Sequence, residues 1–183
     1  MELIKQNSQT KLIKSLIVIF LGSLILAISA KIKLPFYPVP MTMQTFVVLF
    51  LGISFGYKIA LGSIILYLLE GILGLPVFSN SPERGIGLAY FIGPTMGYLL
   101  GFLSASYLAS LISKDDNQLV ILFKLIISVS TIYLLGILWL GNVIGWDKPI
   151  FELGAKPFLL AELFKILIAT LLIKYLKNLK KII

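Results

Sequence analysis

Six long apolar runs, each bounded by charged residues, proline or glycine, restrict the fold of this sequence more than any other feature. A helix needs about 20 consecutive, mostly apolar residues to cross the hydrocarbon core of a bilayer. Backbone polar groups in that core must be paired within the protein, so each run predicts an α-helix. We therefore expect an all-α integral membrane protein, a compact bundle of six transmembrane helices that forms a single domain over residues 1–183. The expected spans are approximately 12–30, 41–56, 58–77, 88–112, 119–141 and 157–176.

The composition limits the chemistry that the chain can carry. Hydrophobic residues make up 58% of its 183 residues and charged residues 13%, against about 25% charged residues in an average soluble domain. Cysteine and histidine are both absent, which excludes disulfides, thiolate nucleophiles, Cys/His zinc sites and Ser-His-Asp triads. No GxxxxGKS/T segment is present, so the chain cannot hydrolyse ATP by the P-loop route. We predict that it is not an enzyme and holds no cofactor and no metal.

The basic residues indicate the orientation of the bundle. Six spans place both termini on one side, where ten lysines would lie, against five cations on the other side. Because an excess of Lys and Arg marks cytoplasmic loops, we expect a multi-pass protein of the cell membrane with cytoplasmic termini. This arrangement accounts for the net charge of +8 without a nucleic-acid partner. The segments 31–40, 78–87 and 142–156 would then face outward.

Two opposite charges interrupt the last apolar run. Glu162 and Lys165 are three residues apart, so they share one face of the predicted helix. Each would cost about 2.5–3.5 kcal/mol at a lipid-exposed helix centre, and we expect both to face protein or water. Two interpretations remain open: an ion pair that only neutralises itself, or a polar patch in a ligand cavity.

Other polar residues in the apolar runs carry less information. Glu70 has no charged neighbour in the sequence, and it would either support helix packing or line a pocket. Gln44 is a lone amide near the outer end of the second run. In the outer segment 78–85, Asn80 and Arg84 either belong to a solvated turn or contact a ligand. Arg84 is the single arginine of the chain, and its planar guanidinium suits a carboxylate or ureido oxygen.

The fourth run is interrupted near its start. Pro94 removes a backbone donor and disfavours helical geometry at Gly93, so we expect the helix to begin or kink there, with Thr95 following. Free backbone groups at this depth are tolerated where they line a cavity or are covered by protein.

Small residues recur at helical spacing in two of the runs. In lipid, helices associate through close backbone approach at such residues. Packing within the bundle is the interpretation for Gly97, Gly101, Ala105 and Ala109. Packing within the bundle and docking onto a separate membrane partner both remain open for the strip in the first run. This strip is made of Ser23, Ala27 and Ala30.

Several of these segments together resemble the BioY family, the biotin-specific S components of energy-coupling factor (ECF) transporters. The resemblance covers about residues 20–175. It rests on the segments PFYPVPMTMQTFVVLFLG, YLLEGILGLPVF, GPTMGYLLGF and PFLLAELFKILIATLL.

The resemblance implies a lipid-embedded subunit that captures biotin at the external face. It would deliver biotin inward together with a transmembrane coupling subunit and two cytoplasmic ATPases, so that only the partners use ATP. The strip Ser23, Ala27 and Ala30 matches the face that meets the coupling subunit. The implied biotin-binding residues are Gln44, Asn80, Arg84, Gly93, Thr95, Glu162 and Lys165. Aromatic walls are expected from Tyr98, Tyr133 and Trp139.

Rival interpretations remain open on the sequence. Family members often have Asp at the first position of the acidic-x-x-Lys pair, where this chain has Glu162, and the extra methylene would shift that contact. An S component for another vitamin, such as thiamin or riboflavin, would share the architecture. A structural membrane protein without a ligand would use Glu162 and Lys165 only as a pair. A metal-dependent membrane enzyme is disfavoured, because no clustered carboxylates supply a metal site.

Overall fold

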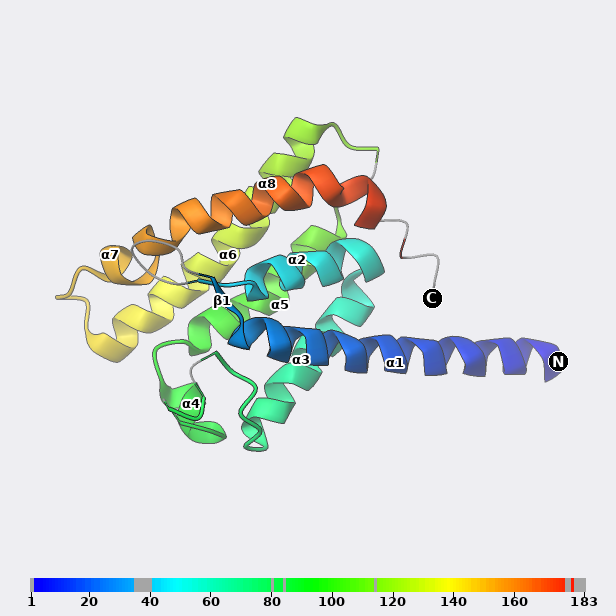
Figure 1. Cartoon of the computed structure of the whole chain (residues 1–183), viewed down its shortest axis with the longest axis horizontal. Coiled ribbons are helices and arrows are strands. Elements are labelled where there is room, and N and C mark those ends of the chain that lie inside the picture. The colour runs from blue at the N-terminus through cyan, green and yellow to red at the C-terminus, as the bar shows by residue number, and fades with distance from the viewer. Residues whose placement is uncertain are drawn as a thin grey trace.

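The chain forms a helical bundle (Figure 1). A computed structural model describes residues 2–34, 41–79, 81–83, 85–113, 115–176 and 179. The longer helices are α1 (Glu2–Lys31), α2 (Gln44–Phe55), α3 (Tyr57–Ile72), α5 (Met96–Ser110), α6 (Gln118–Ile144) and α8 (Leu159–Leu176). The shorter elements are α4 (Leu88–Ile92), α7 (Ile150–Gly154), the 3-10 turn η1 (Lys156–Phe158), β1 (Lys33–Leu34) and β2 (Met41–Thr42).

Each of the six apolar runs contains one of the longer helices, with changes at the ends. The third helix ends at Ile72 rather than near residue 77, and a turn and irregular chain follow it. The fourth run is divided into α4 and α5 by residues 93–95, which confirms the predicted break at Gly93-Pro94. The last outer segment, expected to be a loop, contains α7.

A short antiparallel pair of strands was not predicted. β1 pairs with β2 so that Lys33 lies opposite Thr42 and Leu34 opposite Met41. This pairing brings the chain after α1 directly against the chain that enters α2. Figure 1 shows β1 directly after the end of α1 that is remote from the N-terminus.

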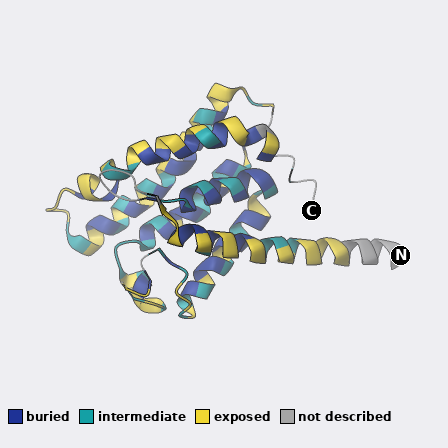
Figure 2. Ribbon diagram, in the orientation of Figure 1, coloured by how far each residue is buried: buried dark blue, intermediate teal, exposed yellow. Residues whose placement is uncertain are grey.

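Helix α2 forms the centre of the bundle. It contacts α1, α3, α5, α6 and α8, and nine of its twelve residues are buried. Figure 2 shows this contrast, with buried residues along α2 and exposed residues along the outer sides of α1 and α8.

The small residues of α5 pack within the bundle, as predicted. A Cβ atom on Gly101 would lie 2.6 Å from the Cα atom of Ile132, and one on Gly97 would overlap Trp139 and the Leu135 carbonyl. Ala105 and Ala109, further along the ladder, are fully buried. Close backbone contact with α6 therefore requires glycine at positions 97 and 101, while Ala109 lies close to Gly52 of α2.

The small-residue strip of α1 also packs inside the chain. Ser23 and Ala30 have no exposed surface, and Ala27 packs against the core. The hydroxyl of Ser23 donates to Glu70 on α3 over 2.8 Å. The expectation that this strip meets a coupling subunit is therefore corrected, because α1 uses it to approach its neighbours within the bundle.

The outer surface of the bundle is apolar. Two stretches in the described chain are long and apolar enough to cross a bilayer by themselves, Gln9–Lys31 and Gln118–Ile144, with mean hydropathy of 2.4 and 2.3. Large side chains such as Leu16, Phe123 and Leu171 are more than half exposed. Apolar surface on this scale marks a face that contacts lipid or protein.

Candidate functional site

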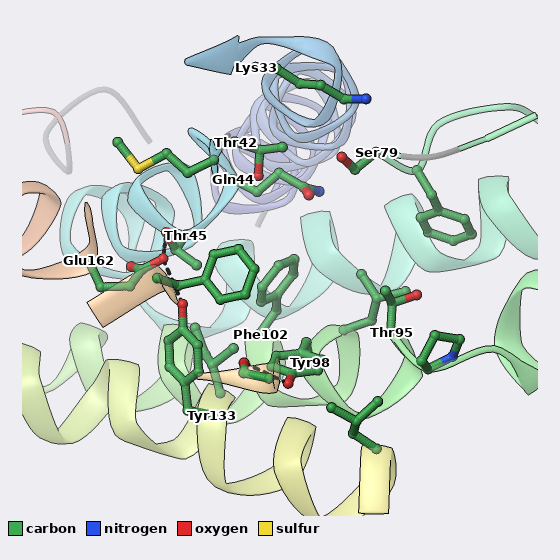
Figure 3. A pocket seen from close by; sticks show the side chains of 18 of the residues that line it. Lys33, Thr42, Gln44, Thr45, Ser79, Thr95, Tyr98, Phe102, Tyr133 and Glu162 are labelled. Atoms are coloured by element: carbon green, nitrogen blue, oxygen red, sulfur yellow. Dashed lines mark hydrogen bonds between the residues drawn. The ribbon is translucent and has the colours of Figure 1, made fainter. Parts of the chain in front are cut away.

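A cavity of about 540 Å³ lies at the end of the bundle that carries β1 and α7. Its volume falls in the range of about 300–1,000 Å³ that is usual for small-molecule sites. The charged side chains on its wall are Lys33, Glu162 and Lys165. The aromatic side chains are Tyr67, Phe78, Tyr90, Tyr98, Phe102, Tyr133 and Phe158. Figure 3 shows these groups converging from strands, helices and the segment after α3.

Glu162 and Lys165 form a buried ion pair, as their spacing suggested. Lys165 Nζ lies 2.7 Å from Glu162 Oε1, and the two side chains are 2% and 7% exposed. Breaking such a pair by removing one partner leaves an uncompensated buried charge, which is strongly destabilising.

The ammonium group of Lys165 is fully used within the protein. Besides Glu162 it donates to Thr45 Oγ1 over 2.5 Å and to the Thr42 carbonyl over 3.1 Å. A lysine ammonium has three hydrogens, and here each has an acceptor. Lys165 therefore fixes α8 to the start of α2 and has no donor left over for a ligand.

Only one of the two carboxylate oxygens of Glu162 accepts hydrogen bonds from the described residues. Its Oε1 accepts hydrogen bonds from Thr45 (3.0 Å), Tyr133 (3.1 Å) and Lys165. Its Oε2 is buried and has no partner. Because buried carboxylate oxygens nearly always accept hydrogen bonds, Oε2 is an unused acceptor on a residue that lines the cavity.

The aromatic wall is held by hydrogen bonds and ring contacts. Tyr98 and Tyr133 pack edge to face with their centroids 6.0 Å apart, and the Tyr98 hydroxyl donates to the Gly154 carbonyl over 2.8 Å. On another side, Phe78 stacks on Tyr90 with centroids 4.4 Å apart. These contacts give the cavity rigid apolar surfaces beside the Glu162 oxygen.

The segment that carries Phe78 is tied to the end of α1. Lys31 Nζ donates to the carbonyl oxygens of Phe78 (2.8 Å) and Ser81 (2.6 Å) and lies 3.4 Å from the Ser81 hydroxyl. The lysine at the end of the first apolar run thus positions part of the cavity wall.

The predicted ligand contacts divide into three groups. Gln44, Thr95, Tyr98, Tyr133, Glu162 and Lys165 line the cavity. Asn80 and Arg84 lie outside the described residues.

Gly93 and Trp139 form the third group and do not line the cavity. The indole nitrogen of Trp139 donates to the Gly93 carbonyl over 2.9 Å. This contact holds the α4–α5 break in place, and the contact of these two residues with a ligand stays a prediction.

Glu70 supports packing instead of lining the cavity. It accepts the hydrogen bond from Ser23 and is absent from the cavity wall. This contact selects the packing interpretation that the sequence had left open.

Sequence reasoning missed several cavity residues. Thr45 precedes its partner Glu162 by 117 positions, a separation that no local pattern connects. Tyr67 is fully buried and accepts a hydrogen bond from Gln44 over 2.8 Å.

Within the described residues, His, Cys, Asp and Glu side chains form no group of three or more that could hold a metal ion. The cavity wall instead combines one buried ion pair with hydroxyls, an amide and aromatic rings. Such a surface binds and orients a small molecule.

These features define a class, a helical bundle with an apolar outer surface and a polar cluster inside an otherwise apolar, largely aromatic pocket. A family model described as BioY family matches residues 4–181, and the chain belongs to that family. Among its relatives, the probable biotin transporter BioY of Pyrococcus horikoshii is 33% identical, over 90% of this chain and 95% of that protein. The biotin transporter BioY of Thermotoga maritima is 31% identical, over 85% and 91%.

The fold is also that of a solved structure. The S-component for biotin from an ECF-type ABC transporter, known from a crystal structure at 2.1 Å, superposes with a TM-score of 0.72. The match covers 91% of this chain and 92% of that chain at 21% sequence identity. At this identity the likeness establishes the shared helical architecture.

Proposed function

We propose that this chain is the substrate-binding membrane subunit of a biotin uptake system. The observation that carries the proposal is the aromatic cavity with Glu162 on its wall, a buried carboxylate whose Oε2 has no partner. The names of the relatives, biotin transporter BioY, supply the ligand.

The chemistry of biotin suits this cavity. Its ureido ring carries two N–H donors and one acceptor, and the fused thioether ring is apolar. Glu162 Oε2 would accept a ureido N–H, while Tyr98 and Tyr133 cover the rings. Gln44 and Thr95 provide further polar contacts on the wall, and Asn80 and Arg84 remain proposed contacts from the outer segment.

The membrane arrangement is part of the same proposal. We place six spans in the cell membrane, with both termini in the cytoplasm and the cavity facing outward. The apolar faces of α1, α6 and α8 support this placement. In Figure 1 the N-terminus of α1 and the end of α8 point toward the same end of the bundle, away from β1 and α7.

Concentrative uptake requires partners. The sequence has no P-loop, so energy would come from a transmembrane coupling subunit and two cytoplasmic ATPases of the ECF type. The partner surface would be a lipid-facing surface other than the buried Ser23 strip. Radiolabelled biotin uptake by cells that carry this chain, with and without an ECF module, tests this part.

The ligand itself is tested on the detergent-solubilised protein. Mass spectrometry of the denatured protein should detect copurified biotin, and added biotin, but not thiamin or riboflavin, should displace labelled biotin. Displacement by thiamin or riboflavin at equal concentrations would make this an S component for another vitamin. Failure of the folded protein to bind any of the three would contradict the proposal.

Orientation is tested separately. Because the chain has no cysteine, single cysteines at Lys11 and Lys148 can be labelled without background. An impermeant maleimide applied to intact cells should modify the cysteine at position 148 and leave the one at position 11 unmodified. The reverse pattern would overturn the assigned orientation.

A further inference from the structure

Three lysines near the cavity differ in how their ammonium groups are used. Lys165 donates to three acceptors within the protein. Lys31 donates to the segment after α3. Lys33 lines the cavity, and no residue in the described part of the chain forms a hydrogen bond or ion pair with its side chain. Of these three cations, Lys33 is the one that has its hydrogens available.

The position of Lys33 follows from the strand pairing. It lies directly opposite Thr42 in the β1–β2 register, and directly opposed residues project from the same face of a two-stranded ribbon. Both residues line the cavity. Lys33 is exposed whereas Glu162 is buried, which puts Lys33 at the mouth. Figure 3 shows Lys33 and Glu162 on opposite sides of the pocket.

The charges on the described wall do not cancel. Glu162 and Lys165 neutralise each other, and Lys33 leaves an excess of one positive charge. A ligand that carries N–H donors on a ring at one end and a single negative charge at the other would match both the Glu162 carboxylate and the Lys33 ammonium.

We infer that Lys33 contacts the carboxylate of the bound ligand and so fixes its direction, with the ureido ring at Glu162 and the carboxylate at the mouth. The inference rests on the proposed biotin-binding function and adds to it the identity of the carboxylate contact.

The expected effect is modest and electrostatic. An exposed charge pair is weakened by solvent and by salt, and charges at the rim of a site act mainly on the association rate. We expect Lys33→Met to weaken biotin binding about three- to tenfold, chiefly through slower association, and to remove most of its salt dependence.

The experiment compares two ligands on the intact protein in detergent: biotin, and biotinamide, in which a carboxamide replaces the carboxylate. Wild-type protein should bind biotin about three- to tenfold more tightly than biotinamide. The Lys33→Met variant should bind the two ligands with equal affinity, because its affinity for biotin falls while its affinity for biotinamide stays the same. Lys148→Met, which removes an exposed lysine that is not on the cavity wall, should keep the wild-type preference.

The inference is overturned if Lys33→Met lowers the affinity for biotin and biotinamide equally. It is also overturned if the variant keeps the wild-type preference for biotin. In either case the binding of biotin itself still stands. If wild-type protein binds neither ligand, the proposed function fails, and the inference fails with it. The two failures are therefore distinguishable.

Discussion

Two carboxylates interrupt the apolar helices, and the protein uses them differently. Glu70 on α3 is half-buried, and it accepts a hydrogen bond from Ser23 of the adjacent helix. Glu162 on α8 is 5% exposed, with three donors on one oxygen and none on the other. Only Glu162 lies on the cavity wall.

The difference shows what separates a packing carboxylate from a binding one. Both would be costly in contact with lipid, so an acidic residue in an apolar helix does not by itself mark a site. Glu162 is held through Oε1, and its Oε2 has no donor although the residue lies on the cavity wall.

Removal of Lys165 should have the largest effect. Lys165→Met leaves Glu162 as a buried charge without its counter-ion and removes the hydrogen bonds from Lys165 to Thr42 and Thr45. Breaking a buried pair in this way costs about 3–5 kcal/mol. We expect a marked fall in the thermal unfolding temperature and a loss of biotin affinity of about 100-fold or more.

The matched control is Lys148→Met, measured by the same thermal scan and calorimetric titration. It should resemble wild-type protein in both. A Lys165→Met variant with wild-type affinity would show that the ion pair does not organise the site.

The direct comparison of the two acids comes second. In Glu162→Gln an amide N–H₂ can occupy the place of Oε2, so that donor meets donor when a ureido N–H approaches. A hydrogen bond to a charged group is worth about 1.5–3 kcal/mol, so calorimetry should show a loss of about 10- to 100-fold in affinity. Glu70→Gln keeps an acceptor for Ser23 and should change affinity by less than about threefold. Equal losses in the two variants would remove the distinction between the acids.

A smaller effect is expected from Tyr133→Phe. This change removes one of three donors to Glu162 Oε1 and keeps the ring that packs on Tyr98. A single hydrogen bond contributes about 0.5–1.5 kcal/mol, so biotin affinity should fall about two- to tenfold. An unchanged affinity in a titration at matched temperature would mean that Glu162 does not need this donor.

Ser23→Ala should have the smallest effect on binding. It removes the hydrogen bond to Glu70 at the α1–α3 contact, and we expect a loss of about 0.5–1.5 kcal/mol in the free energy of unfolding. Biotin affinity should stay at the wild-type value. If affinity fell with stability unchanged, Ser23 would belong to the site and the separation of the two regions would be wrong.

Much of the fold could be predicted because hydrophobic runs and proline act locally. The positions of the six helices and the break at Gly93-Pro94 follow from apolar length and from the backbone restrictions of proline. The β1–β2 pair could not be predicted, since two-residue strands carry almost no periodic signal. The strip containing Ser23 fits a neighbouring helix and a separate partner equally well, and only its burial against α3 decides.

The site could be predicted only where its signal was local. Glu162 and Lys165 could be recognised in the sequence because they are opposite charges three residues apart in an apolar run. The pairing of Thr45 with Glu162 and the contact of Trp139 with Gly93 join distant parts of the chain. Aromatic type alone could not tell Tyr133, which lines the cavity, from Trp139, which supports the backbone behind it.

The central claim is that the cavity beside Glu162 binds biotin. Its most direct test is a calorimetric titration of biotin into the intact wild-type protein, with folding verified by a cooperative thermal transition in the same detergent. We predict saturable binding of one biotin per chain. A folded protein that shows no binding of biotin in this titration would contradict the account.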